Sequence, residues 1–292
     1  MAKYLVGIDA GHGMNTGGKR TPALKEDLYI DGKLVKKKGQ CIHEFEWNIA
    51  VSKYLAAALK RCGIDYVYLM DKDGSTDTPL STRASKANSK KCDIVVSNHY
   101  NAFGGCTKFL DRKGGLLVLR TQNCSSKSIK LGELVAKQLE EDIDYGYSYG
   151  LRRDVDISGF TLAILRQTTM PAVLIEYGFM DVWKEAKLML DTKYQKKCAE
   201  SVCKAICKYF GVTYKKEVAK TNKKFKIRVS DNTLNVRKVA DWDAKPITEV
   251  KKGQWLEVID TVDAKNGSTK MYKLESGLYI TSSSKYVEKS MI

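Results

Sequence analysis

The chain has 292 residues, of which 43% are hydrophobic and 29% charged, and it carries a formal net charge of +16. This is the composition of a globular protein with room for one medium-sized and one small domain. No apolar run approaches the roughly 20 residues that cross a bilayer, so we expect no membrane insertion. The first residues lead directly into a short strand, without the hydrophobic region of a signal peptide, so we expect no cleaved leader.

The net charge indicates which kinds of partner the protein attracts, and the cysteines indicate that it folds in a reducing compartment. A diffuse excess of lysine attracts polyanions such as nucleic acid, anionic lipid and the polymers of bacterial walls. The sequence has no helix-turn-helix, zinc-finger or RNP-type motif, so we expect no nucleic-acid partner. The eight cysteines form no Cys-x-x-Cys pair, which favours buried, reduced thiols. Cys203 and Cys207 lie one helical turn apart, a spacing that permits metal binding, although packing is the simpler interpretation.

Strands and helices alternate through the first 210 residues. A stripe of Phe45, Ile49, Ala56 and Leu59 is typical of a helix with one buried face. The alternation predicts an α/β fold with a mixed, largely parallel sheet flanked by helices. The predicted strands are 4–8, 66–70, 93–97, 115–120, 163–165 and 172–175, and the predicted helices are 44–62, 80–89, 126–143 and 194–210.

The pattern changes after the last predicted helix. Residues 212–224 are rich in lysine and lack periodicity, which indicates a linker. From residue 225 onward apolar residues alternate with polar ones between short turns, which predicts a small all-β domain. The expected domains are therefore 1–211 and 225–292. Between 21 and 40, the stretch LYIDGKLVKKKG predicts a hairpin.

Two of the three histidines follow predicted strands. His12 lies between glycines in GIDAGHG, and His99 follows DIVVS in SNHYNA. Parallel strands bring such residues to one edge of a sheet, and imidazole is the commonest metal ligand, so the pair predicts a zinc site that needs a third ligand. His43, Glu44 and Glu46 are the candidates. The two glutamates are about 200° apart on a helix, so only one faces the site, and periodicity does not choose.

An acid also follows a buried strand in PAVLIEYGF. A carboxylate such as Glu176 at that position is costly unless it points into a polar site. Zinc with three protein ligands keeps a position for water, and a nearby carboxylate can take the water's proton and pass it to a leaving amine. These residues predict zinc-assisted hydrolysis of an amide or ester.

Five motifs together resemble the zinc N-acetylmuramoyl-L-alanine amidases over about residues 3–210: GIDAGHG, HEFEWN, LSTRASKAN, CDIVVSNHYNA and LRQTTMPAVLIEYGFM. In that family the glutamate ligand stands four residues before an asparagine, which is Asn48 here, so the resemblance implies that the ligand is Glu44. The resemblance also implies cleavage of the bond between N-acetylmuramic acid and L-alanine. It implies one Zn²⁺ ion on His12, Glu44 and His99, with Glu176 as the catalytic carboxylate. It also implies that Arg83 and Asn88 support the fold, and that Asn101 and Arg166 contact substrate.

The C-terminal part resembles bacterial SH3-like wall-binding domains through LNVRK, KKGQWLEV and GLYITSSSKYVEK. Such a domain would tether the enzyme to peptidoglycan and to anionic wall polymers. The predicted catalytic domain, the wall-binding domain, the expected lack of a signal peptide and the reduced cysteines together suit a phage endolysin. Such a protein stays in the host cytoplasm until a holin opens the membrane. The alternatives are a bacterial autolysin or sporulation amidase, a non-catalytic wall-binding protein, and a zinc carboxypeptidase.

Overall fold

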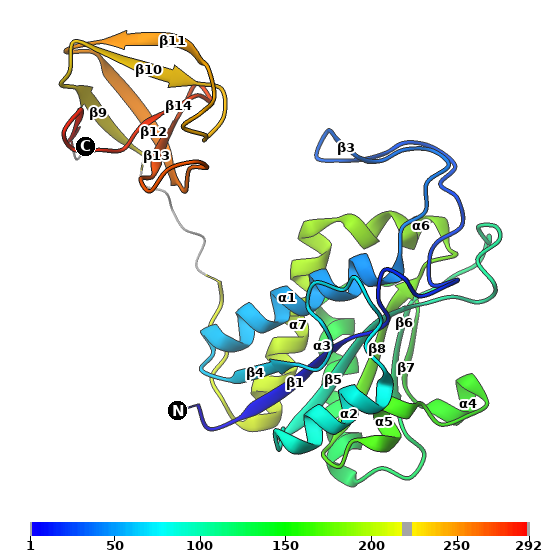
Figure 1. Ribbon diagram of the computed structural model, residues 1–292. Helices are drawn as coiled ribbons and strands as arrows, with labels where there is room; N and C mark the ends of the chain where they lie inside the picture. Colours follow the sequence, from blue (N-terminus) through cyan, green and yellow to red (C-terminus); the bar gives the residue numbers. More distant parts are fainter. Residues whose placement is uncertain (1, 218–223, 291–292) are drawn as a thin grey trace. The chain divides into compact units, whose positions relative to one another are not determined.

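The computed structural model describes residues 2–217 and 224–290. The chain divides into two compact units, Met1–Glu217 and Val218–Ile292. Figure 1 shows an α/β arrangement in the first unit and strands alone in the second. No helix in the described residues is long and apolar enough to cross a membrane.

A six-stranded sheet forms the centre of the first unit, in the order β4-β1-β5-β8-β6-β7. The first four strands of this order are parallel, β6 runs antiparallel to β8, and β7 is parallel to β6. The predicted mixed, largely parallel sheet is thus confirmed. Its strands are β1 (Leu5–Ala10), β4 (Asp65–Tyr68), β5 (Ile94–Asn101), β6 (Leu116–Arg120), β7 (Ser148–Arg153) and β8 (Ala172–Phe179).

Helices cover both faces of this sheet (Figure 1). Ile94 and Val96 of β5 are buried against α1, α3 and α7, whereas Val95 is buried with residues of α2 and α5 on the other face. Strands covered on both sides are apolar almost throughout, which explains the run DIVV in the sequence. The helices are α1 (Glu44–Arg61), α2 (Leu80–Ser89), α3 (Ser126–Asp142), α4 (Asp154–Ser158), α5 (Ala163–Gln167), α6 (Trp183–Ala186), η1 (Lys187–Leu190) and α7 (Thr192–Phe210).

The prediction of a strand at 163–165 is wrong, because these residues begin helix α5. The main-chain N–H groups of Leu165 and Arg166 both donate to the carbonyl of Leu162, which closes a helical turn. A three-residue apolar run fits a strand or a buried helical turn equally well by periodicity. The turn buries its apolar side chains against the sheet face beside β8.

Strands β5 and β8 are longer than the sequence predicts. They continue past residues 97 and 175, so His99 and Glu176 lie within strands rather than after them. The polar run SNH resembles a strand end, yet Ser97 and Asn98 are buried and find polar partners. The Ser97 hydroxyl donates to Asp9 at 2.6 Å, for example. Polar side chains that are paired in this way do not end a buried strand.

The predicted hairpin is confirmed as β2 (Leu28–Ile30) and β3 (Lys33–Lys36), which pair antiparallel. Its turn places Asp31 and Gly32 in the left-handed region, with φ of 49° and 74°. Leu28 is buried in the core beneath α1, and Lys36 forms an ion pair with Glu46 at 3.0 Å. The hairpin is therefore anchored at the beginning of α1.

Residues 212–217, within the predicted linker 212–224, pack on the first unit. Val212 and Tyr214 contact its core, and the Arg61 side chain donates to the carbonyl of Lys215 at 2.7 Å. These contacts extend the first unit past its last helix. The rest of the predicted linker, apart from Lys224, lies outside the described residues.

The second unit confirms the predicted all-β fold. Seven antiparallel strands follow the order β11-β10-β14-β13-β12-β9-β15. Its core consists of six buried aliphatic side chains: Ile227, Val236, Val258, Leu274, Ile280 and Val287. The strands are β9 (Phe225–Val229), β10 (Thr233–Arg237), β11 (Pro246–Lys251), β12 (Trp255–Val262), β13 (Met271–Leu274), β14 (Tyr279–Thr281) and β15 (Val287–Ser290).

Candidate active site

Four predicted site residues come from neighbouring elements of the first unit. His12 follows β1, and Glu44 is the first residue of α1. His99 lies on β5 and Glu176 on β8, where the two are partners in the sheet register. The central strands and the first turn of α1 therefore bring together residues that lie up to 164 positions apart in the sequence.

Glu44 joins the two histidines. Its Oε2 lies 3.3 Å from His12 Nε2, and its Oε1 lies 3.0 Å from His99 Nδ1. The two imidazole rings meet edge to face, with centroids 5.0 Å apart. One ligand atom from each of the three residues lies within 4.8 Å of the others, a spacing at which the three can hold a metal ion.

The Glu44 carboxylate is buried and well supported. It accepts hydrogen bonds from the Tyr100 main-chain N–H at 3.1 Å and from Asn48 Nδ2 at 3.2 Å. Burial alone would raise its pKa, but hydrogen bonds and electrostatic attraction from His12 and His99 outweigh burial and hold the pKa of Glu44 well below its ordinary value. The carboxylate is thus kept in the charged form that binds a cation.

The turn that carries His12 depends on a glycine and an arginine. His12 has φ of 64°, which is uncommon for a residue with a side chain. A Cβ atom on Gly11 would overlap the imidazole of His99, so a glycine permits the two segments to approach. Arg83 is buried and donates to the carbonyls of Ala10 at 2.6 Å and His12 at 3.0 Å. These bonds fix the turn and the direction of the His12 side chain.

Glu176 differs from Glu44 in its surroundings. Its Oε2 is buried and has no hydrogen-bond partner in the described protein. Burial, reinforced by the nearby Glu44 carboxylate, raises the pKa of Glu176 well above its ordinary value. Two carboxyl groups in one site are therefore pushed in opposite directions, one toward the charged form and one toward the protonated form. Such divergence is typical of a site that divides metal binding from proton transfer.

The donor set fits zinc. Two imidazoles and one carboxylate are ligands that Zn²⁺ accepts, and three protein ligands leave a position for reactants. The close approach of Gly11 to His99 and the unpartnered Glu176 oxygen are features that a packed structural site would not need. The residues present therefore fit a catalytic zinc ion.

Glu46, which the spacing alone left as a candidate ligand, has another role. Its Oε2 accepts a hydrogen bond from the His43 main-chain N–H at 2.8 Å, which caps the beginning of α1. Its other oxygen pairs with Lys36 of the hairpin. Both carboxylate oxygens are thus occupied on the side of the helix that meets the hairpin.

The two expected substrate contacts lie in different places. Asn101 ends β5, two residues beyond His99, and its Oδ1 accepts from the Ala102 main-chain N–H at 2.8 Å. Arg166 is exposed on α5, which precedes β8. The structure places Asn101 two residues from His99 on the same strand, whereas Arg166 makes no hydrogen bond or ion pair with the four described site residues.

Sequence reasoning missed a buried polar network beneath the site. Arg83 also donates to Asp9 at 2.8 Å and to Asp77 at 2.6 Å, and Ser97 donates to the second oxygen of Asp9. A charged residue inside the apolar strand VGIDA was the signal, because a buried carboxylate needs a partner. Asn88, expected to support the fold, does so by donating to the Gln167 carbonyl at 2.9 Å.

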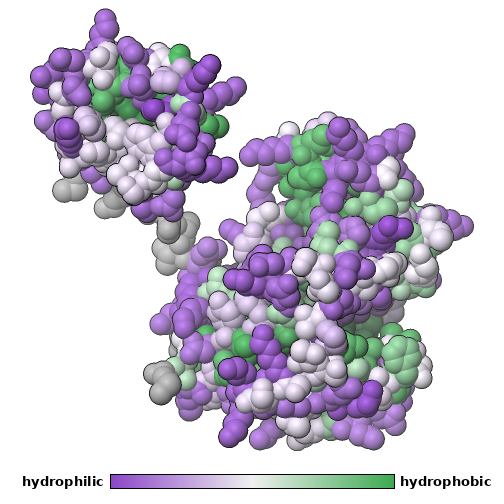
Figure 2. Space-filling model, in the orientation of Figure 1, coloured by the Kyte–Doolittle hydropathy of each residue, from purple (hydrophilic) through white to green (hydrophobic). Residues whose placement is uncertain are grey.

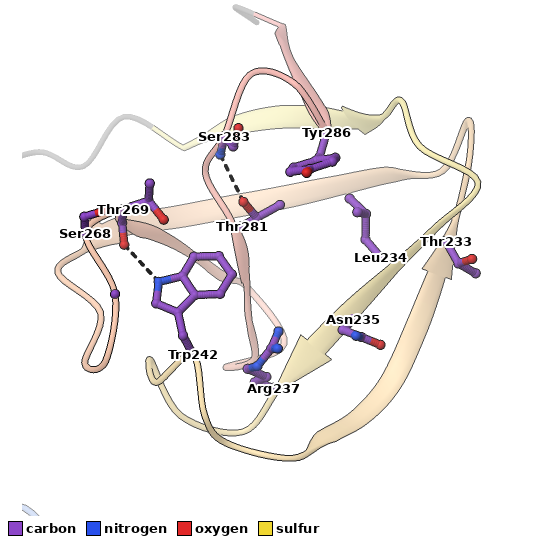
Figure 3. Close-up of a pocket in the computed structure, with 11 residues that line it drawn as sticks. Thr233, Leu234, Asn235, Arg237, Trp242, Ser268, Thr269, Thr281, Ser283 and Tyr286 are labelled. Atoms are coloured by element: carbon purple, nitrogen blue, oxygen red, sulfur yellow. Dashed lines mark hydrogen bonds between the residues drawn. The ribbon is translucent and has the colours of Figure 1, made fainter.

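The second unit has a groove of about 510 Å³. Figure 3 shows Trp242, Arg237 and Tyr286 around it, with Asn235 and several hydroxyl side chains between them. The Trp242 indole donates to the Thr269 carbonyl at 3.1 Å, which orients the ring. No acidic side chain is among the residues that line the groove. Figure 2 shows a largely hydrophilic surface over the same unit.

Comparison with known proteins agrees with this geometry. The profile of the N-acetylmuramoyl-L-alanine amidase family matches residues 6–208. An endolysin of Bacillus phage SPP1 is 33% identical over 97% of each chain. A germination-specific N-acetylmuramoyl-L-alanine amidase of Bacillus subtilis is 36% identical over 70% of this chain and 79% of its own. A solved N-acetylmuramoyl-L-alanine amidase from Clostridium difficile 630 has a TM-score of 0.57 at 26% identity, covering 72% of this chain and 98% of that chain.

Proposed function

The chain belongs to the N-acetylmuramoyl-L-alanine amidase family, and on this premise we propose that its first unit hydrolyses the amide between N-acetylmuramic acid and L-alanine by a zinc and glutamate mechanism. The observation that carries this proposal is the cluster of His12, Glu44 and His99 beside the unpartnered carboxylate of Glu176. We assign the catalysis to residues 1–211.

His12, Glu44 and His99 would hold one Zn²⁺ ion. When bound, zinc would lower the pKa of a water molecule and polarise the scissile carbonyl. The protein supplies a fixed frame for that chemistry. Glu44 is held charged by its hydrogen bonds, and His12 is held in its turn by Arg83. Because three of the four groups lie on or directly after strands of one sheet, their positions do not depend on loop motion.

Glu176 is the proton carrier in this proposal. Its raised pKa lets the carboxylate take a proton from the attacking water and hold it at Oε2. The protonated acid then gives that proton to the leaving L-alanine nitrogen, which departs as an amine. A carboxyl group with an ordinary pKa would release the proton to solvent too readily for the second step.

Asn101 and Arg166 are the proposed substrate contacts. The Asn101 Nδ2 group makes no hydrogen bond within the part of the chain that the structure describes, so it can donate to a substrate carbonyl next to His99. Arg166 is exposed on α5 and offers a charge for a peptide carboxylate. A long wall polymer could reach both, since Arg166 lies outside the cluster itself.

We assign wall binding to residues 225–292, with residues 212–224 as the linker. The groove of Figure 3 combines aromatic rings with Arg237 and lacks acidic groups, which suits anionic wall polymers or peptidoglycan peptides. Residues 215–292 carry 17 basic and 10 acidic side chains, of which five basic and one acidic belong to the linker, so the linker and the domain together favour an anionic wall. Tethering would raise the local concentration of peptidoglycan at the first unit.

The biological role that fits these features is that of a phage endolysin. The similarity to the SPP1 endolysin extends over 97% of both chains and so includes the second unit. All eight cysteines are free thiols in the structure, which suits accumulation in a reducing cytoplasm before release to the wall. A holin would provide that release. The similarity to the Bacillus subtilis amidase, which covers 70% of this chain, keeps a bacterial amidase as the second candidate.

The test is a comparison of the parent with Glu176→Ala and Glu176→Gln on purified Gram-positive wall. Release of new amino groups should fall at least about 100-fold in both variants, because general acid–base catalysis contributes that much. Zinc content and cosedimentation with wall should stay unchanged. Glu133→Gln, at an exposed carboxylate of α3, is the matched control and should retain full activity.

Product analysis separates the remaining hypotheses. The proposed amidase exposes the amine of L-alanine, whereas a carboxypeptidase releases a C-terminal residue. Unchanged turnover by Glu176→Ala would refute the proton-carrier role. Wall binding without any new amine from the parent would instead support a non-catalytic wall-binding protein.

A further inference from the structure

Three buried thiols meet near the carboxyl ends of two packed helices. Cys62 directly follows the last residue of α1, and Cys203 and Cys207 lie one turn apart on α7. The sulfur atoms of Cys62 and Cys203 are 3.8 Å apart, and all three sulfurs lie within 4.8 Å of one another. Each residue is at most 4% exposed. The active-site mechanism makes no use of this cluster.

The spacing of the sulfurs matches a metal site. Zinc–thiolate bonds of about 2.3 Å place two sulfurs of a tetrahedral ion about 3.8 Å apart and those of a planar three-coordinate ion about 4.0 Å apart. A disulfide would need sulfurs about 2.05 Å apart, so the three are thiols. Packing alone accounts for contact between two cysteines. It does not require three sulfurs from two helices to converge on one point.

The surroundings favour a cation. The carboxyl ends of α1 and α7 carry partial negative charge, and Cys62 and Cys207 lie in or next to the last turns. The Lys215 main-chain N–H also points at Cys62, with nitrogen and sulfur 3.3 Å apart. An N–H group directed at a ligand sulfur is the type of contact that supports a metal-bound thiolate.

We propose that Cys62, Cys203 and Cys207 form a second metal site, which binds a soft, thiophilic cation of the Zn²⁺ and Cu⁺ class. Binding would release the thiol protons to solvent as the metal–sulfur bonds form, with no change in oxidation state. The bound ion would join the end of α1 to α7 and, through Lys215, to the segment that extends the first unit. The site is independent of the proposed amidase mechanism.

The experiment measures metal content in the reduced full-length protein. After zinc loading and removal of free metal, the parent should hold about two zinc ions per chain, one at each site. His12→Ala, which disrupts the proposed catalytic site, should keep the second ion. Cadmium loading of His12→Ala should add the ultraviolet absorption of cadmium–thiolate bonds, because its cysteine site remains intact. Anaerobic titration with Cu⁺ tests the other ion of the proposed class.

Cysteine variants test whether the second zinc ion and the cadmium–thiolate absorption come from the proposed cysteine site. Cys203→Ser should lose one zinc ion and the cadmium–thiolate absorption while keeping amidase activity. Cys92→Ser, at a buried thiol in the core beneath α2, is the matched control and should keep both ions. If Cys203→Ser fails to fold, the metal content of the parent and of His12→Ala still tests the proposal. A His12→Ala protein that binds neither zinc, cadmium nor Cu⁺ would overturn the proposal, and amidase activity in the parent would be unaffected by that result.

Discussion

His99 on β5 and Glu176 on β8 are directly paired in the register of the central sheet. Neighbouring strands lie about 4.8 Å apart, so side chains that project from the same face at paired positions remain close. The proposed zinc ligand and the proposed proton carrier are thus positioned by the main-chain hydrogen bonds of two buried strands. A rigid sheet sets their separation, and the turn at His12 and the beginning of α1 complete the site around them.

The unpartnered carboxylate of Glu176 should cost stability in the metal-free protein. Because its folded-state pKa is raised, the folded protein binds more protons than the unfolded chain as the pH rises above the ordinary value of 4.5. The contribution of Glu176 to the free energy of unfolding therefore decreases as the pH increases from 4.5 toward neutral. Glu176→Gln removes this dependence, so the metal-free variant should become more stable relative to the parent as the pH rises from 4.5 to neutral.

Urea unfolding of both proteins in chelator, at several pH values, measures the difference. Glu133→Gln serves again as control, since that carboxylate is exposed on α3. Parallel pH curves for the parent and Glu176→Gln would contradict the assignment of a raised pKa to Glu176.

Much of the candidate site could be predicted from the sequence because its residues stand in strong local patterns. The glycines around His12 mark the end of β1, and the apolar runs before His99 and Glu176 indicate two strands that lead to a ligand site, although both strands continue past these residues. Periodicity could not decide which glutamate is the third proposed metal ligand, since Glu44 and Glu46 both belong to the first turn of one helix. Only the packing of that helix against β5 and the hairpin places Glu44 inward and Glu46 toward Lys36.

The errors in the fold have a similar cause. The lengths of β5 and β8 and the helix at 163–167 depend on partners that are distant in the sequence, such as Asp9 for Ser97. Local propensity carries no information about those partners. The convergence of Cys62 with the two cysteines of α7 is likewise a result of helix packing, because spacing alone showed only Cys203 and Cys207.

The two glutamates of α1 should respond differently to the same substitution. Glu44→Gln removes the charge that joins both imidazoles, so we expect metal affinity to fall by about 100-fold or more. Glu46→Gln loses the ion pair with Lys36, whereas its amide oxygen can still accept the capping bond from His43, so metal affinity should stay unchanged while stability falls by less than about 1 kcal/mol. Competition for zinc with a chelator measures the first effect, and urea unfolding measures the second. Equal losses of affinity would show that Glu44 is not a ligand.

Gly11→Ala should disturb the site without adding or removing any polar group. The new methyl group would occupy the space of the His99 imidazole, so either the ring or the turn before His12 must shift. We expect weaker zinc binding and amidase activity reduced by at least about tenfold, because displacing a catalytic group by about 1 Å can lower the rate strongly. Gly17→Ala is the control, since a Cβ atom at Gly17 meets no other atom within 4 Å. If Gly11→Ala retains full activity and zinc affinity, the close approach of Gly11 and His99 is not required.

The groove of the second unit can be tested with a pair of tryptophans. Trp242 lines the groove, whereas Trp255 on β12 is 54% exposed and does not. In a Glu176→Ala background, which prevents digestion of the wall, Trp242→Ala should weaken cosedimentation with purified wall by about tenfold or more, as expected for a central aromatic contact. Trp255→Ala should leave binding unchanged.

Circular dichroism should first show that both tryptophan variants keep the β-sheet signal, because Trp242 also donates to the Thr269 carbonyl. With Glu176 restored, both variants should cleave a soluble muramyl peptide at the parent rate, since that substrate needs no tether. The difference between wall and soluble substrate assigns the groove to tethering. Equal weakening of wall binding by Trp242→Ala and Trp255→Ala would instead mean that the second unit binds through its general surface and charge.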